Sequence, residues 1–186
     1  MRHILRISAV LAMAVVLATL QTTTPPYAML TGPIRTGEAA SETVAGKTFS
    51  LDVGDIAKAR IIAYDQFGKA VELESSGVWI VVSAELRGFV QTMPIRAATI
   101  VGASGRLYRQ SERAGGAPNI LSLKTLQPGL PTTGLFIFEL PEDETAEMTL
   151  RVSEQYDPQL QDEIAVSLAS DATAPQERLE IGPNGI

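Results

Sequence analysis

The stretch Gly77-Val78-Trp79-Ile80-Val81-Val82-Ser83-Ala84-Glu85-Leu86 decides the fold of this chain. It contains the single tryptophan, and it follows a Ser-Ser-Gly sequence at 75–77 that favours a turn. β-Branched and aromatic residues dominate it, and such residues suit a pleated backbone. The first half is apolar at every position, whereas the second half alternates. That pattern is typical of a strand that enters a core covered on both faces and leaves it half exposed. We therefore predict a central β-strand with Trp79 buried.

Short alternating segments, separated by turn signals every eight to twelve residues, continue on both sides of this stretch. Eight or nine such strands without helical periodicity favour a two-sheet antiparallel sandwich. The predicted core consists of Phe49, Leu51, Val53, Trp79, Ile80, Val82, Phe136, Phe138, Ile164 and Val166.

The first residues have the pattern of an export signal. Arg2 and Arg6 precede a fourteen-residue apolar run, Ile7–Leu20, which is short for a transmembrane helix. No small-x-small cleavage site follows it, and the best candidate, after Ala28, has proline three residues from the cut. Because no charge occurs between Arg6 and Arg35, we expect an uncleaved signal anchor, with a cleaved signal peptide as the alternative.

Four segments follow from these patterns. They are a leader at 1–28, a linker at 29–43, a β-sandwich at 44–169 and a mobile C-terminal tail at 170–186. The tail is polar and bears proline and glycine, and only Leu179–Ile181 suggests a strand in it.

Composition excludes several kinds of chemistry. The chain has no cysteine, and its one histidine, His3, lies in the leader, so the domain cannot form disulfides, thiolate metal sites or a Ser-His-Asp triad. We therefore expect a non-enzymatic protein without cofactors. The net charge is −6, and removing Arg2 and Arg6 leaves thirteen basic against twenty-one acidic residues. An acidic domain of this kind is a poor partner for nucleic acid.

Four short motifs resemble a bacterial family of unknown function. Its members are exported immunoglobulin-like domains, related in fold to mycobacterial secreted immunogenic proteins. The motifs are Gly77-Val78-Trp79-Ile80-Val81-Val82, Ser104-Gly105-Arg106-Leu107-Tyr108, Leu126-Gln127-Pro128-Gly129 and Phe136-Ile137-Phe138-Glu139-Leu140-Pro141. Ser104 stands where the family prefers Asp, which alters the capping of that turn. The resemblance covers about Val44 to Leu168. It implies an all-β, immunoglobulin-like sandwich in an extracytoplasmic compartment, and it brings no catalytic residues with it.

Three candidates for chemistry stay open at this point. Ser122 and Lys124 are two residues apart and would share one face of a predicted strand; they could form a hydrolytic pair if the lysine were desolvated. The acidic turn at 142–147 could bind calcium. Two carboxylates from different strands could act as in a glycosidase, although no pair stands out.

Charge is segregated along the chain. Five arginines against one acid lie between Arg87 and Arg113, and nine acids against Arg151 lie between Glu139 and Glu163. Arginine forks bind carboxylates and phosphates, so we predict a binding surface. Its residues would be Arg96, Arg106, Arg109 and Arg113. Alternatively, the two segments neutralise each other across the sandwich.

Together these patterns predict an exported, membrane-tethered binding or accessory module of the bacterial cell envelope. Its partner would be an envelope protein or anionic lipid headgroups. An envelope hydrolase and a secreted calcium-binding or adhesion domain are the alternatives.

Overall fold

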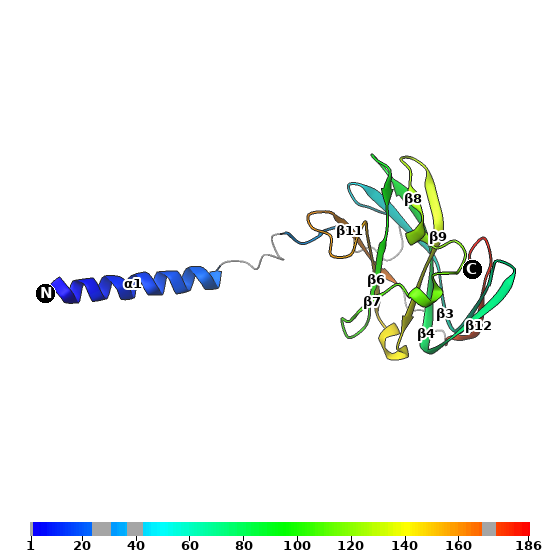
Figure 1. Ribbon diagram of the computed structural model, residues 1–186, viewed down its shortest axis with the longest axis horizontal. Coiled ribbons are helices and arrows are strands. Elements are labelled where there is room, and N and C mark those ends of the chain that lie inside the picture. Colours follow the sequence, from blue (N-terminus) through cyan, green and yellow to red (C-terminus); the bar gives the residue numbers. More distant parts are fainter. Residues whose placement is uncertain (1, 24–30, 37–42, 169–173) are drawn as a thin grey trace. The chain divides into compact units, whose positions relative to one another are not determined.

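The structure is a computed structural model that describes residues 2–23, 31–36, 43–168 and 174–186. The chain divides into an N-terminal unit that contains α1 (Arg2–Thr23) and a β-domain that begins at Pro33. Figure 1 shows the elements of both units.

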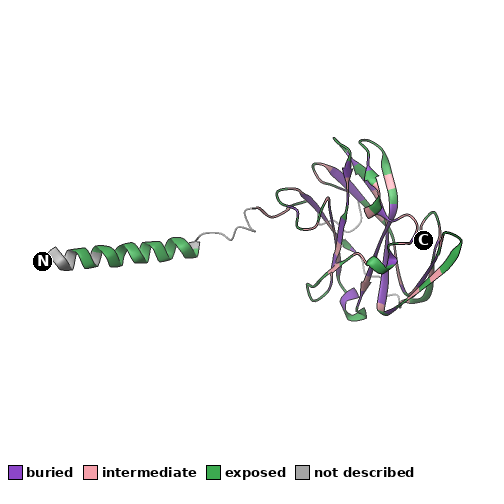
Figure 2. Cartoon of the chain, in the orientation of Figure 1, coloured by how far each residue is buried: buried purple, intermediate pink, exposed green. Residues whose placement is uncertain are grey.

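Helix α1 presents apolar side chains to its surroundings along its length. Its described large apolar residues are 56–71% exposed, and Figure 2 colours the described part of the helix as exposed. None of the helices within the described ranges combines the length and the apolar character needed to cross a membrane. The cleavage site considered after Ala28 lies outside the described residues.

The β-domain is a β-sandwich, as predicted. Sheet A has the strand order β1 (Ile34–Thr36), β11 (Asp162–Leu168), β10 (Met148–Ser153), β6 (Ala97–Val101) and β7 (Leu107–Arg109). Sheet B has the order β12 (Gln176–Ile181), β3 (Phe49–Gln66), β4 (Lys69–Gly88) and β9 (Pro131–Leu140), with β2 (Val44–Ala45) beside β3. Strands β5 (Met93–Pro94) and β8 (Thr125–Leu126) form a separate pair. Three short 3-10 helices complete the domain: η1 (Glu112–Ala114), η2 (Leu121–Leu123) and η3 (Glu142–Thr145).

Strand β4 is central in sheet B, with β3 on one side and β9 on the other. The predicted turn at 75–77 does not form, because β4 continues through all 20 residues, although its pairing with β3 shifts register between Glu74 and Trp79. The Ser75 hydroxyl instead donates to Glu139 Oε1 at 2.8 Å and accepts from the Gly77 N–H at 3.0 Å. A Cβ at Gly77 would overlap the Leu140 carbonyl oxygen. The glycine therefore permits close approach of two backbones, which is a different role from turning the chain.

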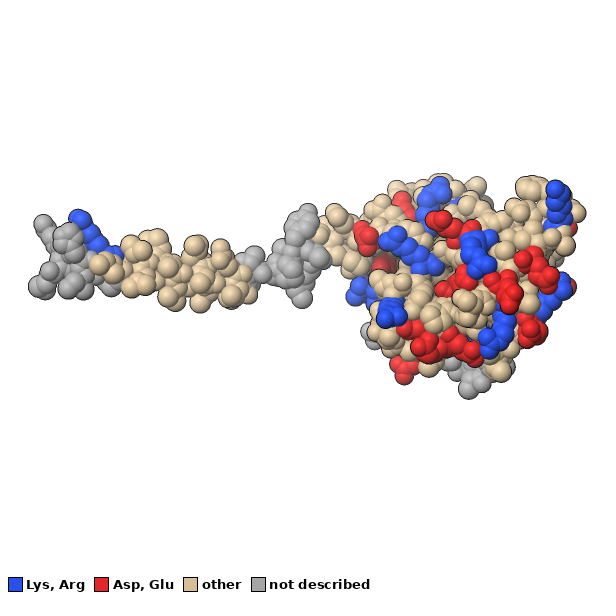
Figure 3. Space-filling view, turned by 60° about the horizontal axis from the view of Figure 1, so that its bottom comes forward, with Lys and Arg blue, Asp and Glu red and all other residues tan. Residues whose placement is uncertain are grey.

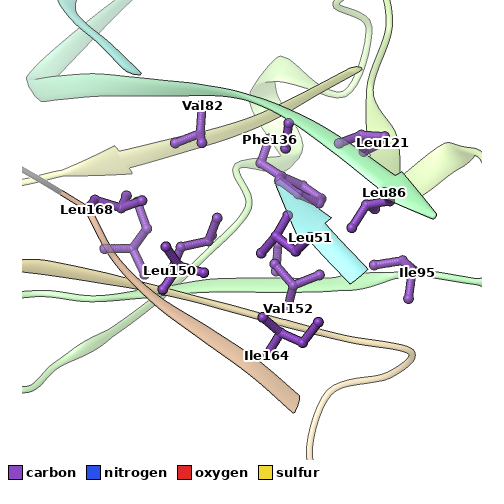
Figure 4. Packing of buried hydrophobic residues seen from close by; sticks show 14 of the residues in the cluster. Leu51, Val82, Leu86, Ile95, Leu121, Phe136, Leu150, Val152, Ile164 and Leu168 are labelled. Atoms are coloured by element: carbon purple, nitrogen blue, oxygen red, sulfur yellow. The ribbon is translucent and has the colours of Figure 1, made fainter. Parts of the chain in front are cut away.

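Both faces of β4 are covered, as the apolar run predicted. Val78, Ile80 and Val82 point into the main core between the sheets, whereas Trp79 and Val81 belong to a second cluster on the opposite face. Figure 4 shows the main core, where Leu51, Val82 and Phe136 of sheet B meet side chains of sheet A; those labelled are Leu150, Val152, Ile164 and Leu168. The second cluster includes residues of β3, β9, β12 and η1.

Trp79 is fully buried, and its indole N–H donates to the Leu73 carbonyl at 2.9 Å. Nine of the ten predicted core residues are buried, and Val53 is partly buried against the core.

Two predicted segment boundaries are wrong. The linker at 29–43 contains β1, which pairs in parallel with β11 and is tied to it by an Arg35–Glu163 ion pair of 2.7 Å. The tail at 170–186 contains β12, which pairs in parallel with β3 and buries Ile181. Both strands are short or polar in sequence, and they form because the edges of the sheets supply their hydrogen-bond partners.

Candidate functional site

A row of outward-facing side chains crosses sheet A. Thr99 of β6 lies directly opposite Arg109 of β7 on one side and opposite Arg151 of β10 on the other. Residues opposite each other in neighbouring antiparallel strands face the same side, with Cβ atoms roughly 5 Å apart. Their sequence neighbours, such as Ile100 and Leu150, are fully buried in the core, which sends this row to the outer face. Two arginines therefore flank one threonine.

This row lines a groove of about 220 Å³ on the outer face of sheet A, which we call the arginine groove. Its small residues come from the middle strands, and its charged residues include the Arg35–Glu163 pair. A second hollow of about 260 Å³ adjoins it, shares Arg109 and Tyr156 with it, and adds Arg96. Arg109 and Tyr156 thus lie where the two hollows meet.

Arg109 is oriented by an aromatic ring more than by a carboxylate. Its guanidinium lies 4.4 Å from the centroid of the Tyr156 ring, a cation–π contact. The distance from Arg109 Nη2 to Asp157 Oδ2 is 4.0 Å, and the Asp157 side chain is 96% exposed. An ion pair so long and so exposed contributes little. The charge of Arg109 is therefore available to a ligand.

The other arginines of the groove differ in their partners. Among the described residues, Arg96 and Arg151 form no side-chain ion pair, whereas Arg35 is bound to Glu163. Guanidinium groups beside a hydroxyl suit carboxylate or phosphate oxygens, which accept two parallel hydrogen bonds from one guanidinium. The face drawn in Figure 3 mixes basic and acidic side chains and presents no large single-sign patch.

Two of the four predicted arginines have structural positions instead. Arg113 Nη1 donates to both carboxylate oxygens of Glu139, at 2.7 and 2.9 Å, and Nη2 donates to the Glu74 carbonyl at 2.8 Å. Its guanidinium also lies 5.3 Å from the Trp79 ring centroid. Arg106 lies at the β6–β7 hairpin beside Glu144 and Tyr108. Of the predicted set, the structure therefore brings together only Arg96 and Arg109, and their binding role stays a prediction.

Glu144 connects the acidic turn to the β6–β7 hairpin. The Ser104 N–H and hydroxyl donate to its carboxylate at 2.9 and 2.5 Å, and the Glu144 residue is only 5% exposed. These two hydrogen bonds from Ser104 lower the pKa of Glu144. Burial is the main cause that raises the pKa of Tyr108, and the Glu144 charge adds to it. Three polar residues of the motif at 104–108 thus converge on one carboxylate, and a Cβ at Gly102 would overlap it.

The calcium alternative finds no support in this turn. Glu144 points to the hairpin, and Glu142 pairs with Arg60 at 3.0 Å, so the carboxylates diverge. Within the described ranges, no group of three or more His, Cys, Asp or Glu residues is placed to hold a metal ion.

The hydrolytic pair is not assembled. Ser122 lies in η2 and not on a strand, so the expected shared face with Lys124 is wrong. The Lys124 amine donates at 2.6 Å both to Asn119 Oδ1 and to the Thr133 carbonyl. Burial lowers its pKa, but its hydrogen bonds point to structural acceptors. The carboxylates that line the arginine groove, Asp157 and Glu163, each face an arginine, and no acid–base pair stands out.

Sequence reasoning missed Arg35, Thr99, Arg151 and Tyr156. Alternation in 148–152 could have placed Arg151 on an outer face, because Leu150 and Val152 are apolar. No sequence signal could have placed it next to Thr99, since that contact depends on strand register.

No protein-family model and no curated protein sequence matches this chain. Solved structures do resemble it. The yjhA protein of Bacillus subtilis is 12% identical with a TM-score of 0.50, over 72% of this chain and all of that one. An uncharacterised β-sandwich protein of Clostridium difficile is 12% identical with a TM-score of 0.46, over 78% of this chain and all of that one. A secreted protein of Mycobacterium tuberculosis is 17% identical with a TM-score of 0.48, over 73% of this chain and 97% of that one. At that identity, the likeness to the Bacillus subtilis protein concerns the fold alone.

Proposed function

We propose that this chain is an exported, non-enzymatic binding module of the bacterial envelope that holds an acidic segment of a partner protein in the arginine groove. The observation that carries the proposal is the row in which Arg109 and Arg151 flank Thr99, with no carboxylate in that row. A peptide carboxylate placed over Thr99 could accept hydrogen bonds from both guanidiniums.

Export is supported by the leader. Arg2 and Arg6 precede an apolar run, and no further charge follows until Arg35. A basic start of this kind stays cytoplasmic while the following domain is translocated. Whether the leader is retained or removed, the domain works outside the cytoplasm.

An acidic protein segment suits the groove better than a sheet of anionic lipid. Glu163 and Asp157 lie among the arginines, and a uniformly negative surface would be repelled by both of them. A folded or extended peptide can place carboxylates at Arg109 and Arg151 and neutral atoms elsewhere. The mixed charge of the groove therefore favours a partner protein whose carboxylates are spaced to meet the arginines and avoid the acidic side chains.

The test is photo-crosslinking in the envelope of living cells. A photoreactive amino acid replaces Leu107, which is 61% exposed and lines the arginine groove. We expect one or a few crosslinked proteins, whose yield falls about tenfold or more when Arg109→Glu and Arg151→Glu are combined, because charge-assisted hydrogen bonds are lost.

The matched control is Arg178→Glu on β12, which reverses a charge on sheet B. It should leave the crosslinks unchanged. An unchanged set of crosslinked proteins in the double variant would contradict the proposal, and recovery of the domain in the cytoplasmic fraction would contradict export.

A further inference from the structure

Three exposed apolar side chains gather on two neighbouring loops at one end of the sandwich. Phe89 and Val90 follow the end of β4 and are 42% and 78% exposed, and Leu130, just before β9, is 56% exposed. We call the residues 88–92 and 127–130 the apolar tip. Contiguous exposed apolar patches, unlike single scattered residues, mark sites of interaction with proteins or membranes.

The apolar tip is held by backbone hydrogen bonds. The Gly129 N–H donates to the Gly88 carbonyl at 3.0 Å, and Gly88 forms a bridge with Pro128. The β5–β8 pair closes the base of the same two loops. Gly129 has a φ of 75°, a conformation that a side chain would strain. The apolar side chains are therefore presented by a defined scaffold.

No charge interrupts this surface. Residues 88–95 and 125–138 contain neither acidic nor basic side chains. Arg87, at the base of the first loop, is exposed and pairs with Glu85 at 2.8 Å. An uncharged apolar surface matches the boundary between headgroups and acyl chains, where apolar side chains insert.

The chain enters the domain close to the apolar tip. The Ile34 N–H donates to the Gln161 carbonyl at 2.9 Å, and Ile34 lies opposite Asp162 in the sheet. The Asp162 carboxylate accepts hydrogen bonds from the Thr48 N–H and hydroxyl at 2.7 and 2.8 Å. The Thr48 carbonyl in turn accepts from the Phe89 N–H at 3.0 Å. Asp162 and Thr48 therefore link, through hydrogen bonds, the point where the chain enters the domain to the apolar tip.

From these observations we infer that the apolar tip inserts into the surface of a lipid bilayer and seats the domain on the membrane. The inference rests on the proposed export of the domain and is independent of the arginine groove, which lies on the outer face of sheet A.

The test uses the full chain bound to vesicles of phosphatidylethanolamine and phosphatidylglycerol. Because the protein has no cysteine, Val90→Cys gives a single attachment point for an environment-sensitive fluorophore. The matched control is Phe67→Cys, at a position that is 98% exposed in the turn between β3 and β4. At 3.3 Å per residue, the 18 residues of β3 separate this turn from the tip by up to about 56 Å along the strand.

We expect the label at Val90 to shift to the blue and to be quenched by lipids that carry a quencher on the upper acyl chain. The label at Phe67 should keep its aqueous spectrum. Adding Leu130→Glu to the Val90→Cys chain should abolish the blue shift, because a carboxylate resists transfer into the bilayer.

An aqueous spectrum at Val90 in chains that float with the vesicles would overturn the inference. Equal quenching at Val90 and Phe67 would overturn it as well, since it would show unspecific adsorption. A chain that fails to float with vesicles also contradicts it. None of these results depends on Arg109 or Arg151. A failure of membrane insertion can therefore be distinguished from a failure of the crosslinking experiment, which tests the arginine groove.

Discussion

Replacing Trp79 by alanine should remove a large part of the stability of the β-domain. The side chain is fully buried in the second cluster, and its N–H bonds the Leu73 carbonyl at 2.9 Å. Truncating a buried tryptophan costs about 3–5 kcal/mol through lost burial and the cavity left behind. Domains are stable by only about 5–15 kcal/mol, so the variant should lose at least about a fifth of the total.

Trp79→Phe separates the two contributions of the indole. It keeps an aromatic ring but loses the N–H, whose hydrogen bond contributes about 1 kcal/mol. The lost hydrogen bond and the smaller ring together should lower the free energy of unfolding by about 1–3 kcal/mol.

The assay is urea unfolding followed by far-ultraviolet circular dichroism, because both variants lack the only tryptophan and cannot be followed by its fluorescence. Phe67→Ala, at a 98% exposed position, is the control and should change the free energy of unfolding by less than about 0.5 kcal/mol. A loss below about 1 kcal/mol in Trp79→Ala, at unchanged slope, would refute the two-sided burial of β4.

Four further outcomes follow from named contacts. Phe67 has a φ of 55°, which suits asparagine better, so Phe67→Asn should raise the unfolding free energy by about 0.5–1 kcal/mol in the same urea assay. Gly77→Ala places a Cβ against the Leu140 carbonyl and should lower the free energy of unfolding by about 1–3 kcal/mol, which corresponds to a fall of several degrees in the melting temperature. The pKa of Glu144 is lowered in the folded state, so the ionised carboxylate stabilises the fold at pH values above the ordinary pKa of 4.5. This stabilisation is lost as the pH falls through the folded pKa. The unfolding free energy of Glu144→Gln should therefore fall less steeply on acidification than that of the original chain. Arg113→Ala should reduce stability and leave crosslinking at the arginine groove unchanged, because its guanidinium bonds Glu139 and not a partner.

Local patterns were sufficient for much of the sandwich. Alternation identified nine buried core residues, and the apolar run at 78–82 identified a strand covered on both faces. The apolar run does not indicate which of its side chains face the main core and which face the second cluster. Trp79 lies in the second cluster, to which β12 contributes Ile181 and η1 contributes Ala114; the sequence suggested a strand only at Leu179–Ile181 and did not predict η1.

The candidate site was predictable only in part. Arg96 and Arg109 were expected on a binding surface, and the structure places both at the joined hollows. Arg113 was grouped with them because it is near in sequence, yet it belongs to Trp79 and Glu139. Arg151 was counted as a single basic residue in an acidic segment, and the register of β6 and β10 brings it beside Thr99.

The sequence by itself predicted an export-type leader, and it determined the lack of histidine and cysteine chemistry in the domain and the inward or outward direction of most strand residues. Those properties depend on composition and on a two-residue period, which are local. The tertiary structure alone decided strand order, the two parallel edge strands and the neighbours of each arginine. They depend on hydrogen bonds between residues far apart in the chain, as between Thr99 and Arg151, and no local pattern records such a partner.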